Sequence, residues 1–131
     1  MSEKRGFERL LLDGDVFIKT KGRKPLAFRA FLDNISFGGF AMFSLENLKT
    51  DRIVEFRLMT KTLDEALVGR GKTRHVTRPP QYDTPLYTVG VEFEKVNKDL
   101  VVHILHRLQA EAALEAQRQN QKSPKLDFIP F

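Results

Sequence analysis

The stretch LYTVGVEFEKVNKDLVVHILHRL, residues 86–108, contains a change of hydrophobic period that indicates the fold class. Its first part, LYTVGVEFE, alternates apolar and polar residues up to Glu94, which predicts a strand with one buried face. Asn97 can then cap a helix, and apolar residues recur at helical spacing from Leu100 to Leu108. The pattern predicts a strand followed by a helix that packs through its apolar stripe.

Five segments before this stretch also have the period-two character and bounding turn residues of strands. They are Asp15–Lys19, Pro25–Leu32, Gly39–Ser44, Arg52–Thr60 and Ala66–Val76. Six short antiparallel strands followed by one helix predict an all-β domain, a small closed or nearly closed barrel with a C-terminal α-helix over one opening. The 11 phenylalanines are expected to supply much of its core.

The composition limits the size, partner and location of the protein. A chain of 131 residues with 41% hydrophobic and 30% charged residues fits one globular domain. Its formal net charge of +5 favours an anionic partner such as a nucleotide, a nucleic acid or a membrane surface. The absence of cysteine excludes disulfides. The polar start MSEKRGFER and the lack of a membrane-spanning apolar run predict a cytoplasmic protein.

Two boundaries divide the chain into three parts. Residues 1–14 form an N-terminal arginine segment, residues 15–122 the barrel with its helix, and residues 123–131 an apolar tail. The second boundary is placed at Ser123-Pro124 because proline is expected to end the helix. The tail sequence LDFIPF is compatible with folding back on the domain and equally with docking to a partner.

Catalytic and metal-binding motifs are not found. The segment GKT, residues 71–73, ends like a phosphate-binding loop, but that motif needs a glycine where Ala66 stands. His103 and His106 lie three apart on the predicted helix without a third ligand, so we predict no metal site. There is no nucleophile elbow and no carboxylate pair, so we predict that the protein is not an enzyme.

Two polar elements remain as binding candidates. Arg5 and Arg9 are four residues apart, and arginine suits bidentate contact with phosphate oxygens and guanine edges. The stretch DNISFGGF, residues 33–40, interrupts an otherwise strand-like sequence. Within it, Asn34 and Ser36 would share one face of a strand, while Gly39 would let the chain turn or a flat ligand approach. We therefore predict one binding site built from both elements.

These residues resemble the signature of the PilZ domain family, Arg-x-x-x-Arg followed by Asp/Asn-x-Ser-x-x-Gly. The matching positions are Arg5, Arg9, Asn34, Ser36 and Gly39. The resemblance implies a six-stranded PilZ-type β-barrel that binds cyclic di-GMP without a cofactor or chemistry. It also implies a signal receptor that acts through a protein partner on motility, exopolysaccharide, biofilm or virulence. Asn34 departs from the commoner Asp, and Lys4 stands where many members carry a further arginine.

The separation of the two elements predicts a conformational response. The ligand would be clamped between the N-terminal arginines and the barrel, and would order the N-terminal segment. Asp33 and Phe37 are expected to serve the fold, with Asp33 pointing to the opposite face from Asn34. Arg74 is a possible additional contact to a phosphate or base, although a solvated face is the favoured interpretation of the strand positions that it shares with Arg70 and Lys72.

Two other functions fit parts of the sequence. One is a PilZ-like interaction module that works without the ligand, for example in type IV pilus function, but the intact motif argues against it. The other is a small barrel that binds single-stranded nucleic acid through aromatic and basic side chains. Steep salt dependence with oligonucleotides and indifference to cyclic dinucleotides would identify the second. The cyclic di-GMP receptor accounts for more of the sequence than either.

Overall fold

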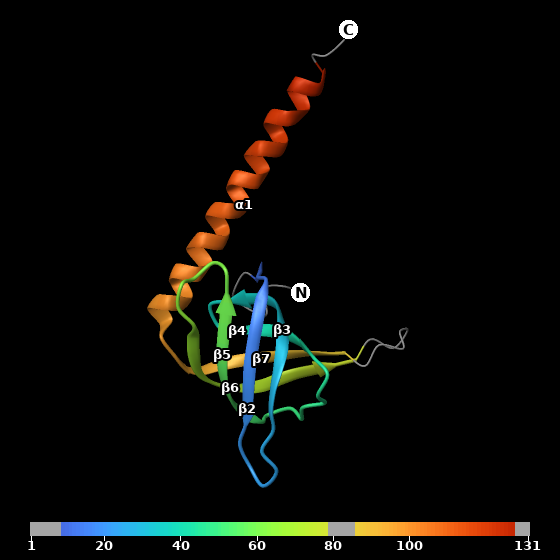
Figure 1. The fold of residues 1–131 in the computed structure, drawn as a ribbon, viewed down its shortest axis with the longest axis vertical. Helices are drawn as coiled ribbons and strands as arrows, with labels where there is room; N and C mark the ends of the chain where they lie inside the picture. The colour runs from blue at the N-terminus through green and yellow to red at the C-terminus, as the bar shows by residue number, and fades with distance from the viewer. Residues whose placement is uncertain (1–8, 79–85, 128–131) are drawn as a thin grey trace.

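The computed structural model describes residues 9–78 and 86–127, which form seven strands and one helix (Figure 1). The six predicted strands are all present, with ends that differ by a few residues. The seventh strand, Leu10–Leu11, was not predicted, because two residues are too few to show an alternating pattern. The elements are β1 (Leu10–Leu11), β2 (Gly14–Thr20), β3 (Ala27–Ser36), β4 (Gly39–Ser44), β5 (Ile53–Thr60), β6 (Leu67–Thr77), β7 (Tyr87–Val96) and α1 (Lys98–Asp127).

Six of the strands close into an antiparallel barrel, as predicted. The sheet runs β1-β3-β2-β5-β6-β7-β4, and a further pairing between β3 and β4 closes the six longer strands into a ring. Closure leaves the six strands without a free edge. The short strand β1 lies outside the barrel and pairs with the last part of β3, where Leu10 is opposite Ile35 and Leu11 is opposite Asn34. The chain that follows Arg9 is therefore attached to β3, the strand that carries Asn34 and Ser36.

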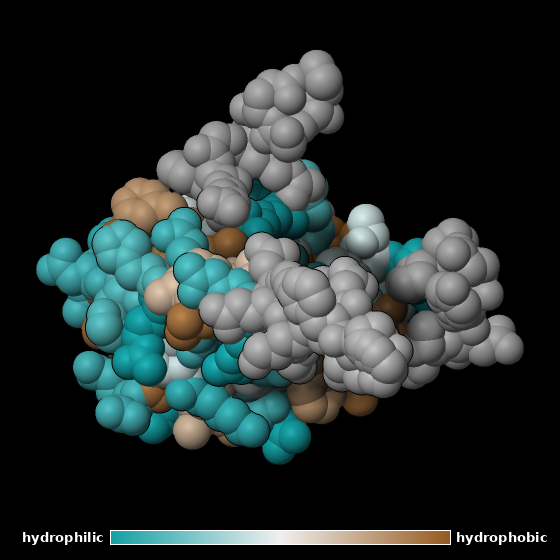
Figure 2. Space-filling view, turned by 90° about the horizontal axis from the view of Figure 1, so that it is seen from above, coloured by the Kyte–Doolittle hydropathy of each residue, from teal (hydrophilic) through white to brown (hydrophobic). Residues whose placement is uncertain are grey.

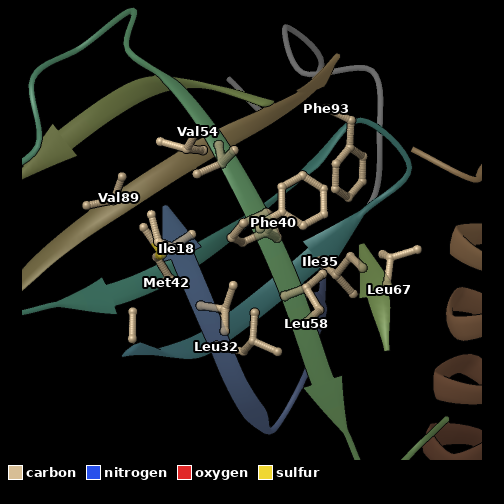
Figure 3. Packing of buried hydrophobic residues seen from close by; sticks show 14 of the residues in the cluster. Ile18, Leu32, Ile35, Phe40, Met42, Val54, Leu58, Leu67, Val89 and Phe93 are labelled. Atoms are coloured by element: carbon tan, nitrogen blue, oxygen red, sulfur yellow. The ribbon is translucent and has the colours of Figure 1, made fainter. Parts of the chain in front are cut away.

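The barrel interior is filled by inward-facing residues of β2 to β7 (Figure 3). The rings of Phe40, Phe56 and Phe93 form a cluster, with centroids 5.1 Å apart for Phe40 and Phe56 and 5.5 Å apart for Phe56 and Phe93. Such edge and tilted contacts stabilise aromatic pairs beyond the area that they bury. Not all phenylalanines contribute, because Phe17 and Phe31 occupy outward positions and remain 44% and 46% exposed.

Helix α1 packs on the barrel through its first turns only. Val101 and Ile104 are fully buried in the core cluster, and the amide groups of Asp99 and Leu100 donate to the Asn97 side chain at 3.0 and 3.3 Å, which confirms the predicted cap. From residue 109 to residue 118 every side chain is exposed, and the helix projects away from the barrel (Figure 1). The coloured residues on the face seen in Figure 2 are mostly hydrophilic.

The helix end was predicted wrongly. Instead of stopping at Ser123-Pro124, α1 continues to Asp127. Proline removes a single backbone donor, and its fixed φ is close to the helical value, so a helix can continue beyond it at a local cost. The tail expected over residues 123–131 is therefore helical in its first five residues, and residues 128–131 lie outside the described part of the chain.

Candidate functional site

A β-bulge at Asp33 gives the motif residues their orientation. The pairing with β4 passes from Leu32 directly to Asn34 while β4 advances by one residue, so Asp33 is the extra residue of β3. Leu32 before the bulge and Ile35 after it are both buried, whereas Asn34 and Ser36 are half-buried. Uninterrupted alternation would have turned Asn34 toward the core together with Leu32. The extra residue instead places Asn34 and Ser36 on the outside of the barrel.

The bulge also corrects the prediction made for Asp33. The Asn34 side-chain amide donates a hydrogen bond to Asp33 Oδ2 at 3.0 Å, so the two side chains contact each other instead of pointing to opposite faces. This hydrogen bond uses one of the two N–H donors of the Asn34 side chain and orients its amide group. A carboxylate is thus present beside position 34, at Asp33, where the commoner motif carries it at position 34 itself.

The turn after Asn34 is short and closed by its own serine. Strand β3 continues through Ser36, which pairs with Gly39, so the interruption expected over residues 33–40 is confined to Phe37 and Gly38. The Gly38 amide donates to Ser36 Oγ at 3.3 Å, and Ser36 Oγ donates to the Gly39 carbonyl at 3.4 Å. The hydroxyl of Ser36 therefore shapes the turn as well as facing outward.

The turn is connected to the start of the helix by Lys98. Its Nζ donates to the Phe37 carbonyl at 2.7 Å and lies 4.2 Å from the centroid of the Phe37 ring and 5.1 Å from that of Phe93. Partial burial of this ammonium lowers the pKa of Lys98. The Gly38 carbonyl accepts from the Phe93 amide at 2.9 Å, so the motif turn is held from two sides.

Lys98→Met should lower the free energy of unfolding by about 1 kcal/mol, because it removes the charged hydrogen bond and both ring contacts while keeping most of the stem. Chemical denaturation followed by circular dichroism measures this change. Lys95→Met removes the same charge from an exposed position on β7 and serves as the control. An equal effect of the two substitutions would show that the contacts of Lys98 do not stabilise the turn.

A cleft of about 290 Å³ opens beside this turn. Four residues singled out in the sequence motifs line it, namely Arg9, Asn34, Ser36 and Gly39, and so does Arg74. The fold thus brings residues that are far apart in the sequence onto one surface. Arg5 belongs to residues 1–8 and lies outside the described part of the chain.

Gly39 has a structural role that the sequence did not reveal. A Cβ at this position would overlap the Val91 carbonyl oxygen of β7 and would lie 3.1 Å from the Glu92 Cα. These are backbone atoms of the neighbouring strand, which cannot move aside as a flexible side chain could. Glycine is therefore required for the close pairing of β4 with β7, in addition to any room that it leaves in the cleft.

The sequence did not point to three other residues of the cleft wall, His75, Gly90 and Glu92. His75 and Gly90 are opposite each other in the pairing of β6 with β7. A Cβ at position 90 would make ordinary contact with the His75 side chain at 3.7 Å, so glycine leaves that flank of the imidazole uncovered. Local alternation could not find these residues, because their place depends on the register between two long strands.

Arg74 has two acidic neighbours. Its Nε and Nη2 donate to Glu92 Oε1 at 3.0 and 2.8 Å, and its Nη1 donates to Asp51 Oδ1 at 2.8 Å. The hydrogen bond and charge of Glu92, followed by the charge of Asp51, raise the pKa of Arg74. The cleft wall thus carries two cations, Arg9 and Arg74, and one anion, Glu92. These three side chains leave the cleft with a net positive charge.

No helix within residues 9–78 and 86–127 combines the length and apolar character needed to cross a bilayer. In the same residues, no group of three or more histidine, cysteine, aspartate or glutamate side chains is arranged to hold a metal ion.

The family model for the PilZ domain matches residues 3–110, so this chain belongs to the PilZ domain family. Solved structures with the same fold include the PilZ domain of YcgR from Escherichia coli with c-di-GMP, at 16% identity and a TM-score of 0.59, covering 85% of this chain and 95% of that one. No curated protein sequence shows significant similarity to the chain.

Two longer proteins also match. The K. pneumonia MrkH–c-di-GMP complex has 18% identity and a TM-score of 0.62, covering 86% of this chain and 54% of that one. The Bacillus subtilis inhibitor of motility MotI/DgrA has 14% identity and a TM-score of 0.61, covering 82% and 51%. This chain therefore spans about half the length of these two proteins. At identities this low, the similarity shows a shared fold and nothing further.

Proposed function

We propose that this protein is a cyclic di-GMP receptor that changes conformation when it binds the ligand and thereby regulates a protein partner. The observation that carries the proposal is the convergence of Arg9, Asn34, Ser36 and Gly39 on one cleft of the barrel. Family membership favours a ligand-binding role over a catalytic one. The proposed receptor uses no cofactor. The solved YcgR and MrkH structures that share the fold contain c-di-GMP.

The chemistry of the cleft suits a flat, anionic nucleotide. Arg9 would contact phosphate oxygens or a guanine edge, and the Asn34 amide, oriented by Asp33, would contact polar atoms of the base. The exposed flank of His75 opposite Gly90 would offer a surface for stacking. Two arginine contacts of about 1.5 to 3 kcal/mol each and base stacking of about 1 to 3 kcal/mol, less the cost of ordering the N-terminal segment, give an affinity no tighter than a micromolar Kd.

The response would be a rearrangement of the N-terminal segment toward the barrel, with Arg5 as the second arginine of the clamp. Strand β1 begins directly after Arg9 and pairs with β3, so a ligand held by Arg9 acts close to the motif strand. Through Lys98 the motif turn is also connected to α1. The projecting helix is a suitable element for a partner in motility, exopolysaccharide or biofilm control in the cytoplasm.

Isothermal titration calorimetry with cyclic di-GMP tests the proposal. We expect saturable binding with a micromolar Kd, and no binding of GTP or of a short single-stranded RNA used as controls. Absence of heat with cyclic di-GMP, together with capture of a protein partner, would instead support the ligand-independent module. Salt-sensitive binding of the RNA alone would support the nucleic-acid-binding barrel.

A further inference from the structure

A charged cluster formed by Asp51, Arg74 and Glu92 lies at the cleft and is here called the rim cluster. Arg74 and Glu92 line the cleft, and Asp51 approaches Arg74 from the chain segment before β5. Three nitrogen atoms of the guanidinium donate to the two carboxylates at 2.8 to 3.0 Å. The side chain that is best placed to join Arg9 in binding an anion is therefore already engaged by two acids.

The backbone holds Asp51 in place for this contact. Its φ is 62°, a left-handed conformation that residues other than glycine seldom adopt. The Asp51 amide donates to the Thr73 carbonyl at 2.7 Å, and the Thr73 amide donates to the Arg52 carbonyl at 2.9 Å. Both bonds attach this segment to β6 directly beside Arg74. The fold thus positions the backbone of Asp51 beside Arg74.

A dianionic ligand in the cleft would encounter opposing effects. Arg9 attracts its phosphates, whereas Glu92 on the same wall repels them and holds Arg74 by charge-assisted hydrogen bonds. These charges are exposed, with Glu92 about half accessible, so solvent and salt weaken each pair and exchange of partners is feasible. Ligand binding through Arg74 therefore requires loss of contacts that the protein makes by itself.

We propose that the rim cluster sets the affinity of the receptor, because Asp51 and Glu92 hold Arg74 and prevent it from contributing fully to binding of the phosphates. This inference rests on the proposed cyclic di-GMP function. It assigns Glu92 and Asp51 as residues that determine the ligand concentration at which the receptor responds. It also gives Arg74 a reserve role, in which the arginine contributes to binding when its acidic partners are weakened.

Calorimetric titration of cyclic di-GMP into Glu92→Gln tests this assignment, because glutamine keeps the size of the side chain and removes its charge. We expect binding about three- to ten-fold tighter than that of the wild type. Arg74→Met alone should weaken binding by about two- to five-fold, because it removes a cation from the cleft and leaves Glu92 without its partner. In the double variant Glu92→Gln/Arg74→Met most of the gain should disappear, since the gain requires a released arginine.

Glu94→Gln is the matched control, because Glu94 lies two residues along the same strand and pairs with Arg70 and Lys72. It should leave the Kd unchanged. An unchanged Kd in Glu92→Gln, or a gain that survives replacement of Arg74, overturns the role of the rim cluster while leaving the receptor function intact. A wild-type protein that binds no cyclic di-GMP overturns the proposed function itself, and the two failures are thereby distinguished.

Discussion

Arg9→Ala should weaken cyclic di-GMP binding about 10- to 100-fold, which corresponds to the loss of a charge-assisted contact of about 1.5 to 3 kcal/mol. Arg9 lines the cleft together with Asn34, Ser36 and Gly39, and it directly precedes β1. Its guanidinium supplies a flat set of donors that lysine cannot reproduce, so Arg9→Lys should restore only part of the affinity. Calorimetry on both variants measures these changes.

Arg57→Ala is the appropriate control for this result. Arg57 lies on the outer face of β5, away from the cleft, and its replacement changes the net charge of the protein by the same amount. If both alanine variants lose affinity equally, the effect is general electrostatic attraction and not a contact in the cleft. The sequence prediction for Arg5 is tested in the same series, with a loss comparable to that of Arg9→Ala.

Gly39→Ala should lower the free energy of unfolding by about 2 to 3 kcal/mol, because a methyl group there overlaps the Val91 carbonyl and must push β4 and β7 apart. Denaturant unfolding measured by circular dichroism quantifies the loss. Gly90→Ala is a matched control on β7, since its methyl group would make only ordinary contacts, the nearest at 3.7 Å. Its stability should be equal to or slightly above that of the wild type.

This comparison separates two roles of the motif glycine. If Gly39 served only to admit the ligand, Gly39→Ala would lose affinity and keep its full stability. The structure instead predicts that Gly39→Ala lowers stability first, and that any loss of binding follows from this destabilisation. A motif glycine is thus not by itself evidence of ligand contact, because the closing strand pair of the barrel requires it too.

Much of the architecture could be predicted from local patterns. Alternation in segments such as Ile53–Thr60 and Tyr87–Val96 reflects burial of one strand face, and Asn97 is a recognisable cap for the helix that follows. Strand β1 was missed because two residues, Leu10 and Leu11, carry no period. The helix extends beyond its predicted end because Pro124 does not terminate it.

The sequence by itself determined the six strands, the start of the helix and the motif residues. Strand alternation, the helix cap and the spacing within each motif involve residues that are close together in the chain. Only the tertiary structure decided how the cleft is built. The extra residue at Asp33 turns Asn34 outward, and the pairing of β6 with β7 brings Arg74 and Glu92 to the same wall. Strand register depends on contacts between residues far apart in the chain, which local periodicity does not encode.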